Sequence, residues 1–454
     1  MAKNIRVLIL AAEAWRGDDS GGNTLNNFFK GMSGVEFAQI YCSDRLPQNK
    51  MCDRYFQISQ SEVLRSFLLH RKVGRVLTPY DIDSQNNRGE KEAESSIVKK
   101  ITLKDKALRW IKRIRPEFLI TFRMLLWHWS NWRTPELEKF IQDFNPDVIY
   151  APCYAFPHHL SLDRYVKNLT KKRMITWTAD DCYSLRHFSL DPFFWINRFW
   201  NRHCLRKTYP YYDEFYSISE EEVLELEPVV NKVRKKSALN CAPVKIGILR
   251  KGVVVPESFT SREVHKPIKF IYAGGLYLNR HKSLIKIADT LRKLNSDGIV
   301  KAELHIYTGS QLNDKDTALL NDGRSVFNHG LISSEKLAQI YKDCDVAIHC
   351  ESFDLKYRLM TRLSFSTKII DCFQSGCAIL AIAWKEHTGI KCLQRNDAAF
   401  CVTDVKDIES VVTHIVENPE LIKEYALKAY ECEKANHRIE DVQKTLYDAF
   451  VRNK

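Results

Sequence analysis

Residues 364–376 read SFSTKIIDCFQSG, and the apolar run AILAIA follows directly after the next cysteine. This pattern predicts a polar turn, a helix with a glycine stop, and a buried strand. Ser366 and Thr367 stand where a helix N-cap is expected, because their hydroxyls can accept from the free N–H groups of the first turn. Lys368 in that turn opposes the helix dipole unless an anion compensates it. The stretch therefore indicates a helix N-terminus that binds an anionic group.

The same order of strand, loop and helix repeats through the second half of the chain. Buried strands are expected in KFIYAGG, AELHIYTG, VFNHGLI and DVAIHCES, with helices between them. Strands that alternate with helices are typical of a parallel sheet covered on both faces. The second half therefore predicts a doubly wound α/β domain, for which we expect residues 246–425.

The first half repeats this pattern less regularly. The apolar run IRVLILAA is followed by the loop GDDSGGN and a helix in TLNNFFKGM, and EFAQIYCS, PDVIYAPCY and RMITWTADD predict further strands. EFYSISEEE predicts a strand, a serine N-cap and an acidic first helical turn. We expect a second α/β domain over residues 1–245, with the basic and polar residues 231–243 as the connection. Residues 426–454 are predicted to be helical.

Length and composition limit the classes of protein that fit. A chain of 454 residues with 44% hydrophobic and 28% charged residues predicts two folded domains. The net charge of +13 indicates a polyanionic partner, such as nucleic acid, anionic lipid or a phosphorylated substrate, although a basic surface without a partner is an alternative. The thirteen cysteines are scattered and form no CxxC pair, which favours reduced thiols in a cytoplasmic protein. No apolar run is long enough to span a bilayer.

One basic and aromatic segment, about 99–135, departs from the α/β pattern. Lysines and arginines interleave there with tryptophan and leucine at helical spacing, as in KDKALRWIKRIR, and LLWHWSNW follows. Cationic residues beside Trp and Leu are typical of a helix that lies on an anionic membrane. A surface helix with a solvated basic face explains the pattern equally well. The segment therefore leaves open a peripheral position at the inner face of the plasma membrane.

The second half also resembles a known family. YAGGLYLNRHKSLIKIA, ELHIYTG, FNHGLISSEKLAQIYKDCDVAIH and FSTKIIDCFQSGCAILAIA, over roughly 268–384, resemble the donor-binding domain of family 4-like GT-B glycosyltransferases that build bacterial surface polysaccharides. The resemblance implies two Rossmann-like domains facing a cleft, with a C-terminal helix that crosses back to the first domain. It also implies transfer of a sugar, hexosyltransferase-like, from a UDP- or GDP-linked donor to a hydroxyl of a glycan or lipid-linked acceptor.

The resemblance assigns the donor's diphosphate to one cluster. In such enzymes an Arg/Lys pair, rather than a metal ion, neutralises the diphosphate, and Arg280 and Lys282 stand where that pair is expected. Cations placed there stabilise the leaving diphosphate as its charge grows. Ser366, Thr367 and Lys368 would hold the phosphates. Arg280 and Lys282 as ordinary exposed charges are the alternative.

Further donor contacts follow from the same resemblance. Asp371 stands where the family has a glutamate for the ribose hydroxyls. The companion glutamate of the family has no clear match, since its place falls near Leu363, and Glu351 is the candidate to take its place across an inserted loop. Gly330 and Leu331 would contact the nucleobase through their backbone, unless they form a simple β-turn. The sequence decides neither the base, the sugar nor the anomeric outcome.

The acceptor half offers fewer candidates. Gly21 and Gly22 are predicted to form a tight loop after the first strand, where backbone N–H groups can approach a phosphate or sugar. Asp180 and Asp181 end a strand at the cleft, where an inverting transfer would need a base for the acceptor proton. Capping the next helix is an equally ordinary role for either aspartate.

Two histidines and two other classes of protein are alternatives to this assignment. His158 and His159 are additional candidates for a base, but a structural role fits them better. A GT-B-fold sugar-nucleotide epimerase or hydrolase would share the donor domain without an acceptor surface. A nucleic-acid-binding protein fits the charge, but the sequence lacks the aromatic and basic sheet motifs or zinc spacings of that class.

Overall fold

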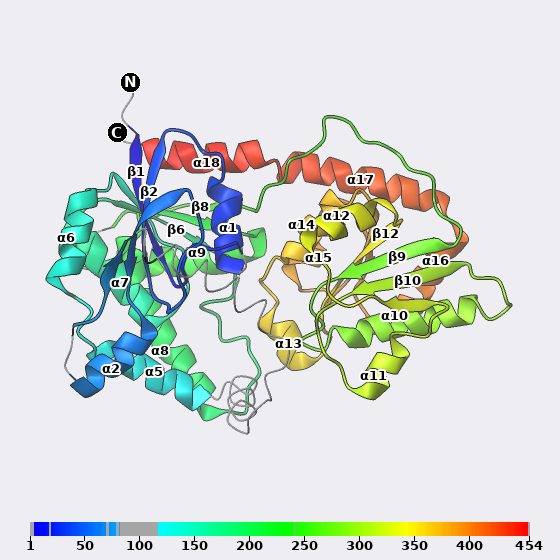
Figure 1. The fold of residues 1–454 in the computed structure, drawn as a ribbon, viewed down its shortest axis with the longest axis horizontal. Coiled ribbons are helices and arrows are strands. Elements are labelled where there is room, and N and C mark those ends of the chain that lie inside the picture. Colours follow the sequence, from blue (N-terminus) through cyan, green and yellow to red (C-terminus); the bar gives the residue numbers. More distant parts are fainter. Residues whose placement is uncertain are drawn as a thin grey trace.

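The chain folds into two α/β domains, each built on one sheet, in the computed structural model (Figure 1). The residues that the structure describes are 4–17, 20–69, 72–78, 81, 117–239 and 241–452. The expected fold class is confirmed: among the strands of the described residues, every pair is parallel except β3 with β4.

The first sheet has the strand order β4-β3-β2-β1-β5-β6-β7-β8. Its strands are β1 (Ile5–Ala11), β2 (Val35–Tyr41), β3 (Cys52–Gln57), β4 (Arg75–Leu77), β5 (Val148–Tyr150), β6 (Arg173–Thr178), β7 (Glu214–Ser217) and β8 (Ile246–Ile248). The helices of this domain are α1 (Ser20–Phe29), α2 (Gln60–Leu69), α5 (Glu117–Trp129), α6 (Pro135–Phe144), α7 (Pro157–Thr170), α8 (Pro192–Thr208), the 3-10 turn η1 (Tyr209–Tyr211) and α9 (Glu220–Lys235).

The second sheet has the strand order β11-β10-β9-β12-β13-β14. Its strands are β9 (Ile268–Ala273), β10 (Ala302–Tyr307), β11 (Val326–Asn328), β12 (Val346–Cys350), β13 (Ala378–Ile382) and β14 (Phe400–Val402). The helices are α10 (His281–Leu294), α11 (Asp314–Leu319), α12 (Ser334–Lys342), α13 (Leu355–Met360), α14 (Thr367–Gln374), α15 (Thr388–Arg395), the 3-10 turn η2 (Val405–Asp407) and α16 (Ile408–Glu417).

The apolar runs became central strands because helices cover both sheet faces. In β1 the side chains of Val7, Leu8, Ile9 and Leu10 are all fully buried, alternating between two core clusters on opposite faces of the sheet. A strand buried on both faces reads as a continuous apolar run, whereas a half-exposed strand alternates. All five residues of β13 are buried for the same reason.

The connection between the domains lies later than the sequence predicted. Residues 231–235 belong to α9, and β8 pairs with β7, so the first sheet extends to residue 248. The boundary expected at 245 is therefore too early, and the basic residues 231–243 are the end of a helix and its turn. A strand of three residues is too short to give a periodic pattern in the sequence.

The C-terminal helices cross back from the second domain to the first, as expected. α17 (Glu420–Asn436) runs along the second domain and α18 (Ile439–Val451) along the first (Figure 1). The ring of Phe450 lies 5.9 Å from that of Phe29 in α1, and Arg173 donates to the carbonyls of Ala449 and Arg452. α18 thus completes the core of the domain in which the chain begins.

The cysteines and the helix lengths agree with two further predictions from the sequence. None of the thirteen cysteines forms a disulfide, as expected from their spacing. Among the helices of the described ranges, none has the length and apolar character that crossing a bilayer requires. Residues 99–116 of the basic segment lie outside the described residues.

Candidate functional site

The two domains contact each other through loops that follow their strands. Arg362 of the second domain donates to Glu225 Oε2 at 2.8 Å and to Asp181 Oδ2 at 3.4 Å, both in the first domain. Arg395 donates to Glu221 at 2.6 Å beside them. These ion pairs connect the carboxyl ends of the two parallel sheets, which is where ligands bind in open α/β folds.

Arg280 and Glu351 form a buried ion pair in the second domain. The guanidinium donates from Nε to Oε2 at 2.9 Å and from Nη2 to Oε1 at 2.8 Å, and the two side chains are 7% and 3% exposed. Burial opposes the charged guanidinium, but the Glu351 carboxylate outweighs it and raises the pKa of Arg280. Arg280 Nη1 is buried and has no partner among the described residues. The pair thus fixes the arginine and leaves one donor unused.

Lys368 converges on the same place from the first turn of α14. Its Nζ donates to Tyr272 Oη at 2.6 Å and to the carbonyl of Gly275 at 3.3 Å, and it lies 4.6 Å from the Tyr272 ring centroid. Burial, assisted by the charge of Arg280, lowers the pKa of Lys368 to about 8. An anion beside these two cations would raise that pKa again.

The start of α14 and its N-cap position match the prediction, but the capping hydrogen bond is not made. Ser366 is the N-cap with extended backbone angles, yet its side chain makes no capping hydrogen bond, and Thr367 is exposed in the first turn. Asp371, one turn later, is exposed to solvent on one side. The surrounding protein still desolvates its carboxylate and raises its pKa, although the charges of Lys251 and Lys368 act in the opposite direction. The first-turn N–H groups are thus not capped by Ser366.

Lys282 takes a different position from its expected partner. Its Nζ is exposed and lies 2.8 Å from Asp354 Oδ2, which also accepts from Asn279 at 2.6 Å. Arg280, by contrast, is buried beside Lys368. The structure therefore brings Arg280 and Lys368 together and pairs Lys282 with an exposed carboxylate.

Gly330 and Leu331 follow β11 at the carboxyl edge of the second sheet. Gly330 has φ of +74°, and its carbonyl accepts from Thr308 N at 2.8 Å. Leu331 is 81% exposed beside Gly309. The backbone is a turn, and both residues stand at the same sheet edge as Gly275, which follows β9.

Two buried histidines stand beside Glu351. His349, Glu351 and His387 each offer a ligand atom within 4.8 Å of the others, and both ring nitrogens of His349 lack a partner among the described residues. Burial lowers the pKa of His349 well below its ordinary value, and the charges of Lys368 and Arg280 act in the same direction. Both Glu351 oxygens accept from Arg280, so a metal ion would have to compete with that guanidinium.

Asp180 and Asp181 occupy different environments at the end of β6. Asp180 is exposed and accepts from Ser364 Oγ of the second domain at 2.6 Å. Asp181 is buried and accepts from Ser184 N at 2.8 Å and Arg198 Nη2 at 2.9 Å. Burial alone would raise the pKa of Asp181, but Ser184 and Arg198 hold it below its ordinary value.

The remaining acceptor-side candidates are structural or differently placed. Gly21 and Gly22 lie in the first turn of α1, so the predicted loop is wrong at these positions. A Cβ on Gly22 would stand 1.8 Å from the Arg16 carbonyl, which explains the glycine as a close backbone approach. His158 and His159 are buried in α7, and His158 stacks on Trp127 at 4.3 Å.

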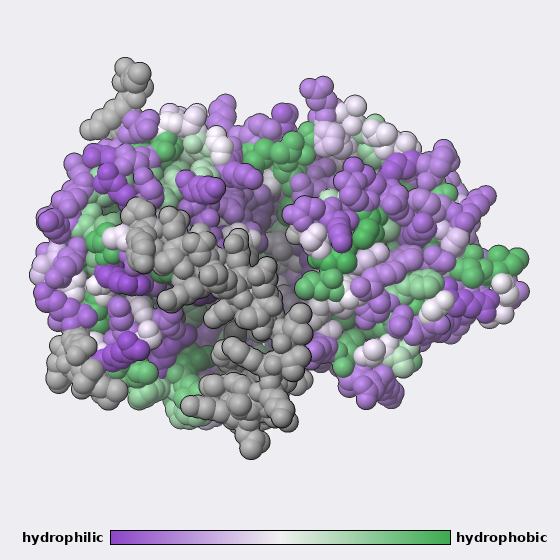
Figure 2. Space-filling model, in the orientation of Figure 1, coloured by the Kyte–Doolittle hydropathy of each residue, from purple (hydrophilic) through white to green (hydrophobic). Residues whose placement is uncertain are grey.

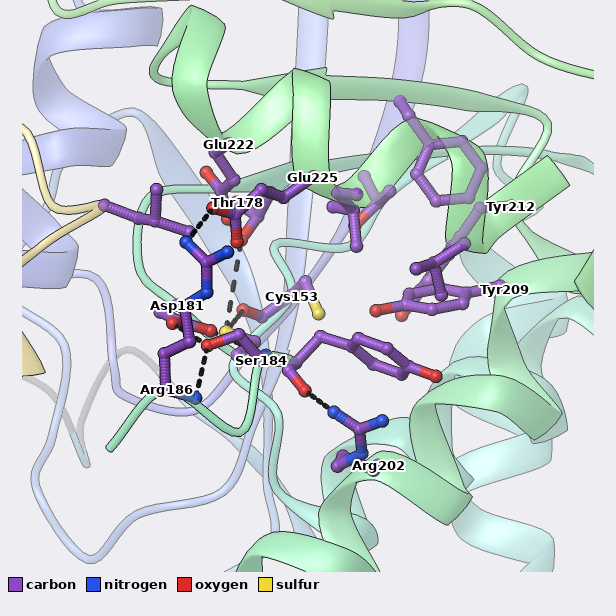
Figure 3. Close-up of a pocket in the computed structure, with 17 residues that line it drawn as sticks. Cys153, Thr178, Asp181, Ser184, Arg186, Arg202, Tyr209, Tyr212, Glu222 and Glu225 are labelled. Carbon is purple, nitrogen blue, oxygen red and sulfur yellow. Dashed lines mark hydrogen bonds and ion pairs between the residues drawn. The ribbon is translucent and has the colours of Figure 1, made fainter. Parts of the chain in front are cut away.

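A cavity of about 300 Å³, here called the tyrosine pocket, opens between Asp181 and α9 (Figure 3). Its walls are mostly apolar, and one residue, Leu363, comes from the second domain, three positions before Ser366. The pocket therefore adjoins the domain interface. Its lining is Cys153, Thr176, Thr178, Asp181, Cys182, Tyr183, Ser184, Arg186, Arg202, Tyr209, Tyr212, Phe215, Glu222, Glu225, Leu226, Val229 and Leu363.

Glu222 is the buried carboxyl group of this pocket. It is 3% exposed and accepts from Ser217 Oγ at 2.7 Å and Thr178 Oγ1 at 3.0 Å. Burial raises its pKa to about 8 in spite of these hydrogen bonds. At neutral pH the pocket therefore contains a protonated carboxyl, which can donate a hydrogen bond.

The sequence indicated two acidic residues of this pocket but not its tyrosines. Asp181 ends a recognisable strand and Glu222 belongs to the predicted acidic helical turn, although no role was predicted for Glu222. Tyr183 and Tyr209, by contrast, lie in a loop and in η1, in stretches without a motif. Only the packing of α8 and η1 beside α9 brings the tyrosines to the strand ends.

Comparison with known proteins supports the fold alone. No protein-family model and no curated protein matches the chain. Solved structures do match: Anabaena HepE in complex with UDP and glucose has a TM-score of 0.56 at 11% identity, over 98% of this chain and 99% of that one. A trehalose-6-phosphate structure from E. coli bound with UDP-2-fluoro glucose has a TM-score of 0.56 at 9% identity over 99% of both chains.

The lipopolysaccharide outer core galactosyltransferase WaaB, in its apo form, has a TM-score of 0.53 at 12% identity over 98% of this chain and 99% of that one. In each comparison the match extends over both domains. With two parallel α/β domains in contact at their strand ends and a C-terminal helix returning to the first, the chain has the GT-B fold of these glycosyltransferases.

Proposed function

We propose that the protein is a glycosyltransferase that moves a sugar from a UDP- or GDP-linked donor to a hydroxyl of a glycan or lipid-linked acceptor, in cell-surface polysaccharide biosynthesis. One observation carries the proposal: Arg280 and Lys368 converge beside the uncapped start of α14, at the strand ends of the second domain. Structures with the same fold contain UDP with glucose, or a UDP-sugar analogue, by their names.

The proposed chemistry follows from charge. As the glycosidic bond breaks, the leaving diphosphate gains negative charge, so fixed cations and N–H donors stabilise the transition state more than the ground state. Arg280 would donate from the unused Nη1, and Lys368 would be fully protonated once the diphosphate is bound. Asp371 can accept from ribose hydroxyls, and Gly330 with Leu331 would contact the base through their backbone.

The proposed acceptor site is the tyrosine pocket with Asp180. Asp180 is exposed at the interface and could take the acceptor proton if the transfer inverts, whereas a front-face retaining transfer needs no such base. Asp181 is held ionised by Arg198 and Ser184, so we assign it to positioning of the loop. Gly21 and Gly22, at the start of α1, remain candidates for backbone contact with substrate.

We propose that no metal ion takes part, because Arg280 and Lys368 already supply positive charge. Activity should then survive treatment with EDTA. A loss of activity that Mn²⁺ or Mg²⁺ restores would overturn this part of the proposal.

We further propose peripheral contact with anionic membrane through 99–133. In the described part of this segment, α5 exposes Phe118, Leu119 and Phe122 beside α8, which exposes Ile196 and Phe199. Apolar surface is visible at the lower edge of the first domain (Figure 2). Replacing Lys104, Arg109, Lys112 and Arg113 with Gln should abolish binding to anionic vesicles, and unchanged binding would contradict this proposal.

The test of the proposed function is ligand-dependent thermal stability. UDP or GDP should raise the melting temperature, a panel of their sugar conjugates should identify the donor, and oligonucleotides should have no effect, because ligands that bind only the folded state stabilise it. No shift with any nucleotide would overturn the proposal. Rapid sugar release without an acceptor would instead support the epimerase or hydrolase alternative.

A further inference from the structure

A second cavity continues the tyrosine pocket away from the domain interface. This cavity, of about 780 Å³ and here called the basic groove, shares Tyr183, Arg202 and Val229 with the pocket. Its lining is Tyr183, Arg202, Arg206, Lys207, Pro210, Tyr211, Val229, Lys232, Val233, Lys236, Ser237, Ala238 and Leu239.

One face of α9 lines both cavities. Glu222, Leu226 and Val229 line the pocket, and Val229, Val233 and Lys236, the last directly after the helix, line the groove. Positions three or four apart share a helix face, so the two cavities form one path along α9. At 1.5 Å per residue the path from Glu222 to Lys236 is about 20 Å long. An elongated ligand could therefore reach from the groove to the interface.

The groove is strongly cationic, and the described residues give it no counter-charge. It is lined by Arg202, Arg206, Lys207, Lys232 and Lys236, and none of its described lining residues is a carboxylate. Within the described ranges none of these five cations forms an ion pair, although the chain has 56 acidic residues. Five unpaired cations around one cavity repel each other, and an anion in the cavity would remove that repulsion.

Two of the cations are held in place by Tyr183. Its ring centroid lies 4.1 Å from the Arg202 guanidinium and 5.7 Å from that of Arg206, and its hydroxyl accepts from Arg206 Nε at 2.6 Å. Burial, together with the charge of Arg206, lowers the pKa of Arg202. Tyr183 therefore links the aromatic pocket to the cations of the groove.

We propose that the basic groove binds the phosphate of a glycosyl phosphate acceptor whose sugar ring occupies the tyrosine pocket. This rests on the proposed function and defines its acceptor. Aromatic rings and the protonated Glu222 suit a sugar ring with its hydroxyls, and the cations suit a phosphate or diphosphate about one ring further out. The phosphate could belong to a lipid-linked sugar or to a soluble sugar phosphate.

The test compares two variants with equal charge change. Lys232→Gln with Lys236→Gln removes two groove cations, whereas Lys336→Gln with Lys444→Gln removes two exposed lysines elsewhere. Pyrophosphate binding is measured by calorimetry with UDP at saturation, so that the donor site is closed. We expect the groove variant to bind pyrophosphate at least tenfold more weakly and the control variant to bind like the wild type.

Two further measurements complete the experiment. UDP affinity of the groove variant should stay within twofold of the wild type, so failure of the groove is separable from failure of the donor site. Once the donor is identified, glucose 1-phosphate and a farnesyl diphosphate-linked sugar are each tested as acceptor. The acceptor whose KM rises in the groove variant is the source of the phosphate that the groove binds. Equal pyrophosphate affinity in the groove and control variants would overturn the inference. Arg206→Gln removes a third groove cation and serves as a second groove variant in the same measurement.

Discussion

At the scale of single residues, the site depends on groups whose charge is set by burial. Lys368 has its pKa lowered to about 8, and Glu222 has its pKa raised to about 8, in each case chiefly by burial. A buried group avoids charge unless a partner compensates it. Lys368 of the proposed donor site and Glu222 of the tyrosine pocket should therefore both change protonation between about pH 7 and 9.

Lys368 should make binding of UDP to the proposed donor site depend on pH. Near pH 8.5 most of the free protein lacks the Lys368 proton, and a bound diphosphate raises its pKa, so binding of UDP should take up roughly three quarters of a proton. Calorimetry in buffers of different ionisation enthalpy measures this uptake. Lys368→Met should abolish it and weaken UDP binding roughly ten- to hundredfold, which corresponds to about 1.4–2.7 kcal/mol. Equal uptake in the variant would contradict the assignment.

Glu222 should make the folded state less stable at high pH. The unfolded carboxyl ionises near pH 4.5 and the folded one near 8, so the folded state binds the extra proton in this window and stability falls as pH rises through it. Glu222→Gln carries no charge and should melt at the wild-type temperature at pH 4.5, but a few degrees higher at pH 8. Glu225→Gln, one turn away and paired with Arg362, should instead melt lower at pH 8.

At the scale of elements, helix α14 and the loop after β9 form one unit. Gly274 has φ of +145°, and a Cβ there would stand 2.3 Å from Lys368 Cε. The loop must therefore carry glycine for the lysine side chain to reach Tyr272 and Gly275. The lysine that opposes the dipole of α14 is thus accommodated by a strand end almost a hundred residues earlier.

Gly274→Ala should damage the donor site without unfolding the domain. The added methyl displaces Lys368, so we expect UDP affinity to fall roughly tenfold. Gly323→Ala is the matched control, because Gly323 also has a positive φ, of +70°, but has open space around its Cβ position. It should cost backbone strain of about 1 kcal/mol, less than alanine at the φ of Gly274, and leave UDP affinity unchanged. Equal losses in both variants would show that strain alone is responsible.

At the scale of the whole molecule, ion pairs hold the two domains at the present separation. Arg362 is 4% exposed and lies between Glu225 and Asp181, while Arg395 contacts Glu220 and Glu221. Both sets join the loops around α14 and α15 to the first domain. Charge pairs at such a contact fix the relative orientation of the domains more than they add stability.

Arg362→Gln should loosen this contact. We expect a larger radius of gyration in solution scattering and a melting temperature lower by a few degrees, since about 1–3 kcal/mol is typical for loss of one partner of a partly buried pair. Arg186→Gln is the control: it removes an exposed ion pair to the same Glu225 within the first domain. It should change neither quantity, and equal changes in both variants would contradict the role of Arg362.

Much of the fold could be predicted because local patterns determine it. The apolar run of β1, the serine cap of α9 and the start of α14 all lie where the residues indicate. Ser366 is the N-cap as predicted, but its side chain makes no capping hydrogen bond. The loop at Gly21 and Gly22 and the domain boundary were wrong, and both depend on contacts from other segments: the Arg16 carbonyl beside Gly22 and the pairing of β8 with β7.

The sequence by itself determined the two α/β domains and marked the start of α14 as a candidate anion site, because periodicity and the position of Lys368 in a first helical turn are local properties. Only the tertiary structure decided that Arg280 pairs with Glu351 while Lys282 pairs with Asp354. It also decided that tyrosines and unpaired cations line one path along α9. Both depend on which segments pack together, and burial and charge at those contacts follow from the packing rather than from neighbours in the chain.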